Sequence, residues 1–320
     1  VRQLTADSHF LWFAFLAVVL LTWVLYRFTH RLGQNISNLR SFAKRVDHNE
    51  SVDSEDLIEF PNDELGEIAE RIIKLYKRLQ TTQQEQDVLK RQLTQNVAHE
   101  LKTPVASIQG YLETIINYPD APEATKKQFV DRCYAQAQRL TSLLRDISTL
   151  NRIDDAPDLM GKEEVVDIME LVRGIEKDVH LQLQERHMKF DNQMPERVLV
   201  HGNRSLLYSI FRNLTDNAIN YAGEHTTITL RAQLDDDDNI AGLPQRWKFS
   251  FSDNGVGVPA EHLPRLFERF YRVDKGRSRK MGGTGLGLAI VKNAVLLHGG
   301  TISVTNNLTG GLCFRFTLSE

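Results

Sequence analysis

The sequence has few cysteines and little net charge, and both shortages restrict the classes of protein to which it can belong. Cys133 and Cys313 are the only cysteines, they lack the spacing of a metal site, and each falls in an apolar periodic segment typical of a buried thiol. A disulfide framework is therefore excluded, and a reducing compartment is expected. The net charge of −3 over 320 residues gives no reason to expect direct binding to nucleic acid.

Charge is also missing locally, from residues 10–26, which read FLWFAFLAVVLLTWVLY. Aromatic residues stand near both ends of this run, and Arg27, His30 and Arg31 follow directly. A signal peptide is the competing interpretation, but no small-residue cleavage site follows. We therefore predict a single transmembrane helix in the cell inner (plasma) membrane, with all later residues in the cytoplasm. Because the chain begins with Val1 and not Met, we also expect a fragment that lacks its N-terminal part.

Between residues 32 and 79, two amphipathic helical patterns flank a polar connector at residues 47–56. Each helix has one narrow apolar seam and needs a partner helix, which predicts a parallel dimer with a four-helix bundle below the membrane. The seam turns polar at Thr82 and Gln86 and resumes at Leu89, Leu93 and Val97. This break is typical of a segment with two competing arrangements, although a plain coiled-coil spacer has the same pattern.

Residues 96–105 read NVAHELKTPV and combine a histidine, a carboxylate and a hydroxyl. On a helix, His99 and Thr103 share one face, and Glu100 is the immediate neighbour of His99. Pro104 has no N–H group and crowds the carbonyl of residue 100, so we expect a local loosening that acts as a hinge. A surface helix with an ordinary histidine is the simpler interpretation of these residues taken alone.

Two long helical patterns, at residues 105–116 and 129–150, are separated by a Pro-containing turn at residues 118–122. They predict a helical hairpin whose wide apolar stripes pair with a second copy in a dimeric four-helix bundle. His99 falls one residue past the stripe and is therefore displayed on the outside.

From about residue 157, segments rich in β-branched and aromatic residues alternate with helical patterns, which predicts an α/β sandwich with one mixed sheet and helices on one face. The expected strands are residues 189–192, 197–200, 226–234, 247–252, 301–306 and 313–318, and the expected helices are residues 167–185, 204–222 and 286–298.

Polar residues form a stripe on the otherwise apolar helix at residues 204–222: Asn213, Asp216, Asn217, Asn220 and Tyr221. Asn side chains four residues apart offer carbonyl oxygens to a hard cation such as Mg²⁺. A solvated helix face is the alternative interpretation of such a stripe.

Two glycine-containing clusters follow. Asp253 stands at the end of a strand and precedes Gly255 and Gly257, so its carboxylate is placed to accept from an exocyclic amine of a base while the backbone turns close to a flat ring. Residues 282–288 read GGTGLGL and lead directly into a helix, a pattern that presents N–H groups to phosphate oxygens. Between them, the basic residues 275–280 are expected to form a loop that closes over an anionic ligand.

In this order and spacing, the motifs resemble those of a membrane-bound sensor histidine kinase of two-component systems that lacks its extracytoplasmic sensor. The resemblance covers essentially the whole chain. It implies the end of an extracytoplasmic segment at residues 1–9, a transmembrane helix at 10–26, a HAMP-type relay module at 27–80, a dimerisation and phosphoacceptor hairpin at 81–156, and a catalytic ATP-binding domain of the Bergerat type at 157–320.

The resemblance also implies site roles, with ATP and Mg²⁺ as ligands. His99 would take the γ-phosphoryl group, Glu100 would accept a hydrogen bond from its imidazole, and Thr103 would orient water for dephosphorylation of the partner. Asn217 would hold Mg²⁺ with help from Asn213. The implied nucleotide-binding residues are Asn213, Asp216, Asn217, Asn220, Tyr221, Asp253, Gly255, Gly257, Arg269, Tyr271, Lys275, Gly283, Thr284, Gly285, Leu286 and Gly287.

The implied partners are a second copy of the chain, a cytoplasmic response regulator with an acceptor aspartate, and membrane lipid. The chain departs from the family pattern at Asn220, where a phosphate-contacting lysine is usual, and at Asn35, where the relay module usually has a proline. Two other functions are compatible with the nucleotide motifs: an ATP-gated clamp of the chaperone and topoisomerase kind, and a nucleotide-binding scaffold without transfer.

Overall fold

A computed structural model of the chain describes residues 2–47, 64–154, 164–235, 245–274, 283–307 and 310–319. The chain divides into two compact units, residues 1–92 and residues 93–320. The candidate site lies in the second unit.

The first unit contains the helix α1 (Arg2–Asp47) and the beginning of α2 (Glu64–Asn117). Within α1, the stretch Phe15–Gln34 is long and apolar enough to cross a membrane, somewhat later than the expected span at residues 10–26. Its two threonines, Thr22 and Thr29, donate their hydroxyl hydrogens to carbonyls of the preceding turn, which suits an apolar surrounding. The expected connector falls almost entirely in residues 48–63, outside the described residues, so the relay module stays a prediction.

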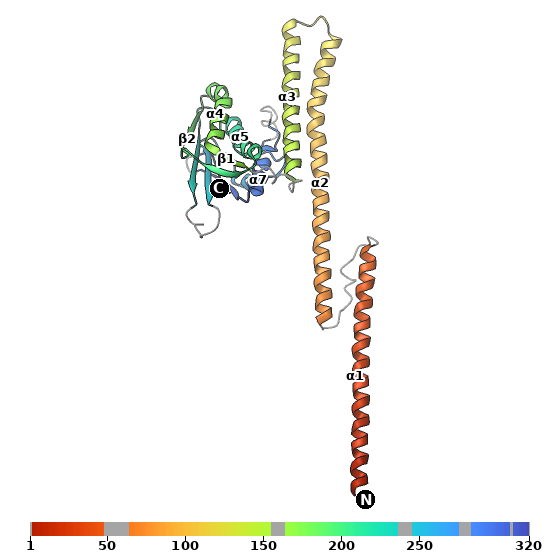
Figure 1. The fold of residues 1–320 in the computed structure, drawn as a ribbon. Helices are drawn as coiled ribbons and strands as arrows, with labels where there is room; N and C mark the ends of the chain where they lie inside the picture. Colours follow the sequence, from red (N-terminus) through yellow and green to blue (C-terminus); the bar gives the residue numbers. More distant parts are fainter. Residues whose placement is uncertain are drawn as a thin grey trace. The chain divides into compact units, whose positions relative to one another are not determined.

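The expected helical hairpin is confirmed by the end of α2 and by α3 (Glu123–Asp154), which run side by side in Figure 1. Tyr111 on α2 stacks on Phe129 of α3, with ring centroids 5.6 Å apart. Cys133 is an unpaired thiol that contacts the Ile108 carbonyl at 3.7 Å, in agreement with a structural role. Pro104 is buried inside α2 and does not end the helix.

The part of the second unit that follows α3 has a five-stranded sheet at its centre. The strand order is β2 (Lys189–Asn192), β4 (Thr227–Leu234), β5 (Arg246–Asp253), β7 (Leu312–Ser319) and β6 (Ile302–Asn306). Only β2 and β4 pair in parallel, and the other neighbours are antiparallel. The mixed sheet is therefore as expected, and its strands begin and end within one residue of the predicted ranges.

The prediction of one sheet was wrong in one respect. The strand expected at residues 197–200 is shifted to β3 (Leu199–Gly202), and it pairs with β1 (Glu164–Asp167) in a separate two-stranded antiparallel sheet. No strand was expected at β1. Four residues are too short to establish an alternating pattern, so this pairing depends on a contact between distant parts of the chain.

Three helices complete this half: α4 (Ile168–Glu185), α5 (Arg204–Tyr221) and α7 (Gly287–Leu297), with a short 3₁₀ helix, η4 (Ala260–Arg265). Phe211 of α5 packs edge-on against Phe249 of β5 and Phe316 of β7, with ring centroids 5.5 and 5.7 Å apart. The core therefore lies between the helices and one face of the sheet. Because side chains alternate along β5, Asp253 is on the same inner face as Phe249 and Phe251.

Candidate functional site

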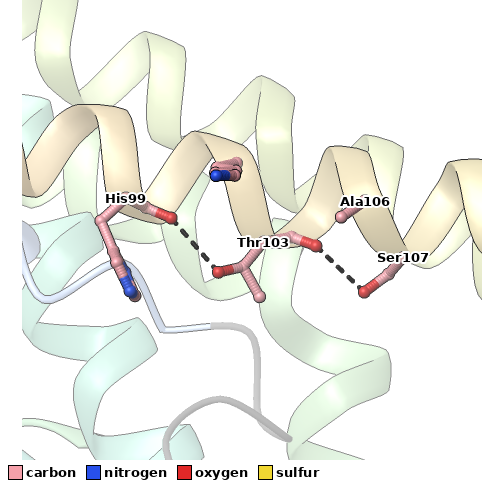
Figure 2. A pocket seen from close by; sticks show the side chains of 5 residues that line it. His99, Thr103, Ala106 and Ser107 are labelled. Atoms are coloured by element: carbon pink, nitrogen blue, oxygen red, sulfur yellow. Dashed lines mark hydrogen bonds between the residues drawn. The ribbon is translucent and has the colours of Figure 1, made fainter.

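His99 is exposed on α2 beside a shallow surface hollow. The hollow is lined by His99, Lys102, Thr103, Ala106 and Ser107. Figure 2 shows the His99 and Thr103 side chains on the same side of α2, as the helical spacing predicts. The Thr103 hydroxyl donates to the His99 carbonyl at 3.2 Å, and the Ser107 hydroxyl donates to the Thr103 carbonyl at 3.0 Å. An imidazole in this position is open to a reactant from solvent or from another domain.

Glu100 is bound differently from what the sequence suggests. Its Oε2 atom accepts from Arg139 of α3 at 3.0 Å and from Arg272, which lies between η4 and α7, at 3.1 Å. The Glu100 side chain is 15% exposed, so both pairs are shielded from water. In this arrangement the carboxylate is held by two guanidinium groups, and its role as an acceptor for the imidazole of His99 stays a prediction.

The polar stripe of α5 lies along the edge of the core. Its five residues, Asn213, Asp216, Asn217, Asn220 and Tyr221, are all half-buried. The Asn213 amide donates to the Ser209 carbonyl at 2.8 Å, which leaves its carbonyl oxygen directed away from its own helix backbone. Asp216 instead accepts from Arg212 at 2.9 Å within α5, so part of its charge is already compensated.

Asp253 is a carboxylate in the core layer and is 7% exposed. Its Oδ1 atom accepts from the Gly255 N–H group at 2.9 Å, and burial raises the pKa of the carboxyl above its ordinary value. A Cβ atom at Gly255 would lie 2.2 Å from the Ala222 carbonyl oxygen at the end of α5. Glycine therefore allows the loop after β5 to approach α5 closely, beside the polar stripe. Gly257 has a φ of 67°, the left-handed region that favours glycine.

The glycine-rich segment packs against both the polar stripe and the loop that precedes it. A Cβ atom at Gly287 would lie 2.7 Å from the Asn213 Oδ1 atom, and Gly285 has a φ of 74° and lies against Phe270. The Gly285 carbonyl accepts from the Phe270 N–H group at 2.7 Å. Gly283 is half-buried, and Leu286 is buried at the start of α7.

Two more implied residues have partners other than a nucleotide in this arrangement. Arg269 donates to both carboxylate oxygens of Asp154, at 2.8 and 3.0 Å. The Tyr271 hydroxyl lies 2.6 Å from His262 Nδ1, and the guanidinium carbon of Arg265 is 4.2 Å from the centroid of the Tyr271 ring. Lys275, with the rest of the basic run, lies outside the described residues.

The structure thus brings together three segments that are far apart in the sequence: the α5 stripe, the Asp253 loop and the start of α7. Close backbone approach at Gly255 and Gly287, a buried acceptor at Asp253 and a helix N-terminus fit a ligand with a flat amine-bearing ring and an anionic tail. Local patterns did not identify Arg139, Asp146, Asp154 or Arg272, because their significance lies in contacts between distant residues.

Comparisons with known protein families match both parts of the second unit. Residues 89–156 match the family described as "His Kinase A (phospho-acceptor) domain". Residues 202–320 match the family described as "Histidine kinase-, DNA gyrase B-, and HSP90-like ATPase". His99 lies in the first match, and the α5 stripe, the Asp253 loop and the start of α7 lie in the second.

Curated relatives carry both parts. The phosphate regulon sensor protein PhoR of Pseudomonas aeruginosa is 31% identical over 287 residues, which are 86% of this chain and 62% of that protein. The signal transduction histidine-protein kinase BaeS of Escherichia coli is 30% identical over 256 residues, 80% of this chain and 51% of that protein. The chain therefore spans about half to three fifths of the length of these relatives.

Solved structures share the fold. A histidine kinase ThkA in complex with the response regulator protein TrrA has a TM-score of 0.56 at 21% identity, over 76% of this chain and 65% of that chain. Full-length ShkA in complex with AMPPNP has a TM-score of 0.50 at 25% identity, over 69% of this chain and 44% of that chain. Because the acceptor hairpin and the ATPase domain follow one another in a single chain, and because its relatives are sensor kinases, the chain belongs to the two-component sensor histidine kinase family.

Proposed function

We propose that this chain is a dimeric ATP:protein-histidine kinase that phosphorylates its own His99 and passes the phosphoryl group to an aspartate of a response regulator. This proposal depends on one observation: a single compact unit contains both an exposed histidine on a helical hairpin and a site that fits a nucleotide. In that site, glycines allow the backbone segments to approach each other closely. The hairpin displays the acceptor, and the ATP-binding domain supplies the donor.

The proposed transfer is a displacement at the γ-phosphorus. A neutral imidazole nitrogen of His99 forms the new N–P bond, the bond from the γ-phosphorus to the bridging oxygen breaks, and ADP leaves with the electron pair. The proton on the other ring nitrogen is held by an acceptor. Glu100, the next residue in the sequence, is proposed as this acceptor, and it becomes available when an arginine partner moves away. Most of the catalytic effect then comes from positioning.

The site geometry supports the ligand-binding roles that we propose. Asp253 accepts from the exocyclic amine of adenine, and its burial excludes water from that hydrogen bond. Gly283, Gly285 and Gly287 let the phosphate groups approach the start of α7. Asn217, with Asn213, is proposed to hold Mg²⁺, which when bound neutralises phosphate charge.

An ATP-gated clamp is the second function that the nucleotide fold allows, and the name of the ATPase family includes such proteins. The match to a phosphoacceptor domain, with His99 exposed inside it, favours the kinase.

Assembly and location complete the proposal. Apolar side chains exposed on the hairpin, among them Leu112, Ile116 and Tyr134, suit burial against a second copy. The response regulator partner is supported by the complex of the structurally similar ThkA with TrrA. A relay module of the HAMP type at residues 27–80 and an inner-membrane location through α1 are the remaining parts, with domain limits as stated above.

Incubation of the purified chain with Mg²⁺ and ATP labelled at the γ-phosphorus tests the central step. A label that is lost in acid and kept in base is expected, because the phosphorus–nitrogen bond of phosphohistidine is acid-labile. ATP labelled at the α-phosphorus serves as the control and should leave the protein unlabelled. An unlabelled protein in both reactions would reject the kinase.

Replacing Thr103 with Ala should separate the two activities toward the regulator. Autophosphorylation is expected to stay within about twofold of the parent, while loss of phosphate from the regulator slows by about tenfold or more, as for a removed water-orienting group. The fold should survive, because the hydroxyl only donates to a carbonyl of its own helix.

Thr114→Ala is the matched control for this prediction, since Thr114 donates to the Gly110 carbonyl in the same way on the same helix. Release of inorganic phosphate from the phosphorylated regulator is the measurement. Equal rates for Thr103→Ala and Thr114→Ala would remove the proposed role of Thr103.

A further inference from the structure

Among the described residues, three pairs of side chains with polar contacts join the hairpin to the ATP-binding half, and in each pair the donor and the acceptor lie on the same sides. The hairpin supplies a carboxylate and the ATP-binding half supplies a donor. The pairs are Glu100 with Arg272 at 3.1 Å, Asp146 with Thr284 at 2.7 Å, and Asp154 with Arg269 at 2.8 Å. In Figure 1, α3 and α7 lie next to each other, where the Asp146 contact occurs.

The Asp146 contact reaches the start of α7. The Thr284 hydroxyl accepts from the Leu286 N–H group at 3.2 Å and donates to Asp146. A chain of hydrogen bonds therefore runs from the N-terminal end of α7, which attracts negative charge, to the carboxylate on α3. Thr284 and Leu286 belong to the segment proposed to bind phosphate groups, so a carboxyl group of the hairpin already accepts a hydrogen bond there.

The Arg272 contact reaches the same segment from the other side. The Arg272 side chain is 6% exposed, and its Nε atom lies 3.2 Å from the position that a Cβ atom would take at Gly285. This Nε atom has no hydrogen-bond partner among the residues that the structure describes, while the Nη2 atom binds Glu100. A buried guanidinium group with a free donor therefore lies against the glycine-rich segment.

Carboxylate and phosphate oxygens compete for the same donors, because both are anionic acceptors for guanidinium, hydroxyl and helix N-terminal groups. We propose that Glu100, Asp146 and Asp154 act as internal substitutes for nucleotide phosphates, so that the docked hairpin restrains nucleotide binding until it is displaced. This inference rests on the proposed function, since it assigns a regulation to the same nucleotide site. In the docked state the three carboxylates restrain the binding of ATP. In the undocked state Glu100 has lost its bond to Arg272 and is available to the imidazole of His99.

The three contacts contribute unequally. Arg272 and Glu100 are shielded from water, and Arg139 also donates to Glu100, so removing one partner would leave a buried charge uncompensated. Asp154 and Arg269 are more exposed, with 44% and 32% of their side-chain surfaces accessible, and their pair is weaker. Asp146 is half-buried on α3 and accepts from Thr284 at 2.7 Å, so its replacement with Ala removes this contact to the glycine-rich segment.

The test measures binding of AMPPNP with Mg²⁺ to the full chain by calorimetry, for the parent and for Asp146→Ala, Asp154→Asn and the double variant. If the docked state excludes nucleotide, the apparent Kd is the intrinsic Kd divided by the undocked fraction, and variants that weaken docking bind more tightly. We expect about threefold tighter binding for each single variant and about tenfold for the double variant. Asp131→Asn, an exposed carboxylate of α3, is the matched control and should bind as the parent does.

The outcomes are distinct. Tighter binding in the Asp146 and Asp154 variants but not in Asp131→Asn supports the restraint. Equal or weaker binding in these variants overturns it and leaves the kinase proposal intact. If neither the parent nor any variant binds AMPPNP, the proposed function fails, and the restraint fails with it.

Discussion

Replacing His99 with Gln is expected to abolish the acid-labile label completely, to below about 1% of the parent, since an amide nitrogen has no lone pair available for attack on phosphorus. His99 is exposed in the surface hollow of α2, so the side chain can be exchanged with little effect on folding. Label after reaction with γ-labelled ATP is the measurement, with circular dichroism to verify the fold.

His180→Gln is the control, because His180 is an exposed histidine on α4 outside the candidate site. It should be labelled like the parent. The His99→Gln variant should also bind AMPPNP with the parent affinity, which distinguishes a lost acceptor from a lost nucleotide site. An acid-labile label that persists in His99→Gln would place the acceptor at another histidine.

The second large effect is expected at Asp253. Its replacement with Asn keeps an oxygen that can accept from the Gly255 N–H group, but presents an amide where a charged acceptor faced the adenine amine. A hydrogen bond to a charged group contributes about 1.5–3 kcal/mol, so binding of AMPPNP should weaken by about 10- to 100-fold. Calorimetric titration gives the affinity, and a change of less than about twofold would contradict the assignment.

The same replacement, Asp253→Asn, should weaken nucleotide binding but raise the stability of the fold. Burial raises the pKa of Asp253 in the folded chain, so the folded state binds the proton more tightly than the unfolded state does. The parent therefore loses stability as the pH rises through that elevated pKa, whereas the neutral Asn does not titrate. The melting temperature of Asp253→Asn relative to the parent should rise from about pH 4 upward and then level off.

Local sequence was sufficient to predict most of the helices and strands. α4 and α5 begin within one residue of the predicted helices, and the structure shows Asp167 and Asn203 as their caps, accepting from backbone N–H groups two or three residues later. The strand β5 was predicted from its composition, and in the structure its side chains alternate so that Asp253 belongs to the buried face. The order of the motifs was also enough to predict the two matched families.

The partners of individual charges were decided by the tertiary structure. Adjacency of His99 and Glu100 suggested that the carboxylate serves the imidazole, yet in the fold two arginines, 39 and 172 residues away in the sequence, occupy one of its oxygens. The pairing of β1 with β3 was equally invisible, because four-residue strands carry too little periodicity.

The sequence by itself therefore determined the helices, most of the strands and the chemical inventory of this protein, because propensity, capping and periodicity act over a few residues. Only the tertiary structure decided which carboxylates lie against the nucleotide segment. Those contacts depend on burial and on charge pairing between distant residues, and neither quantity is defined until the chain is folded.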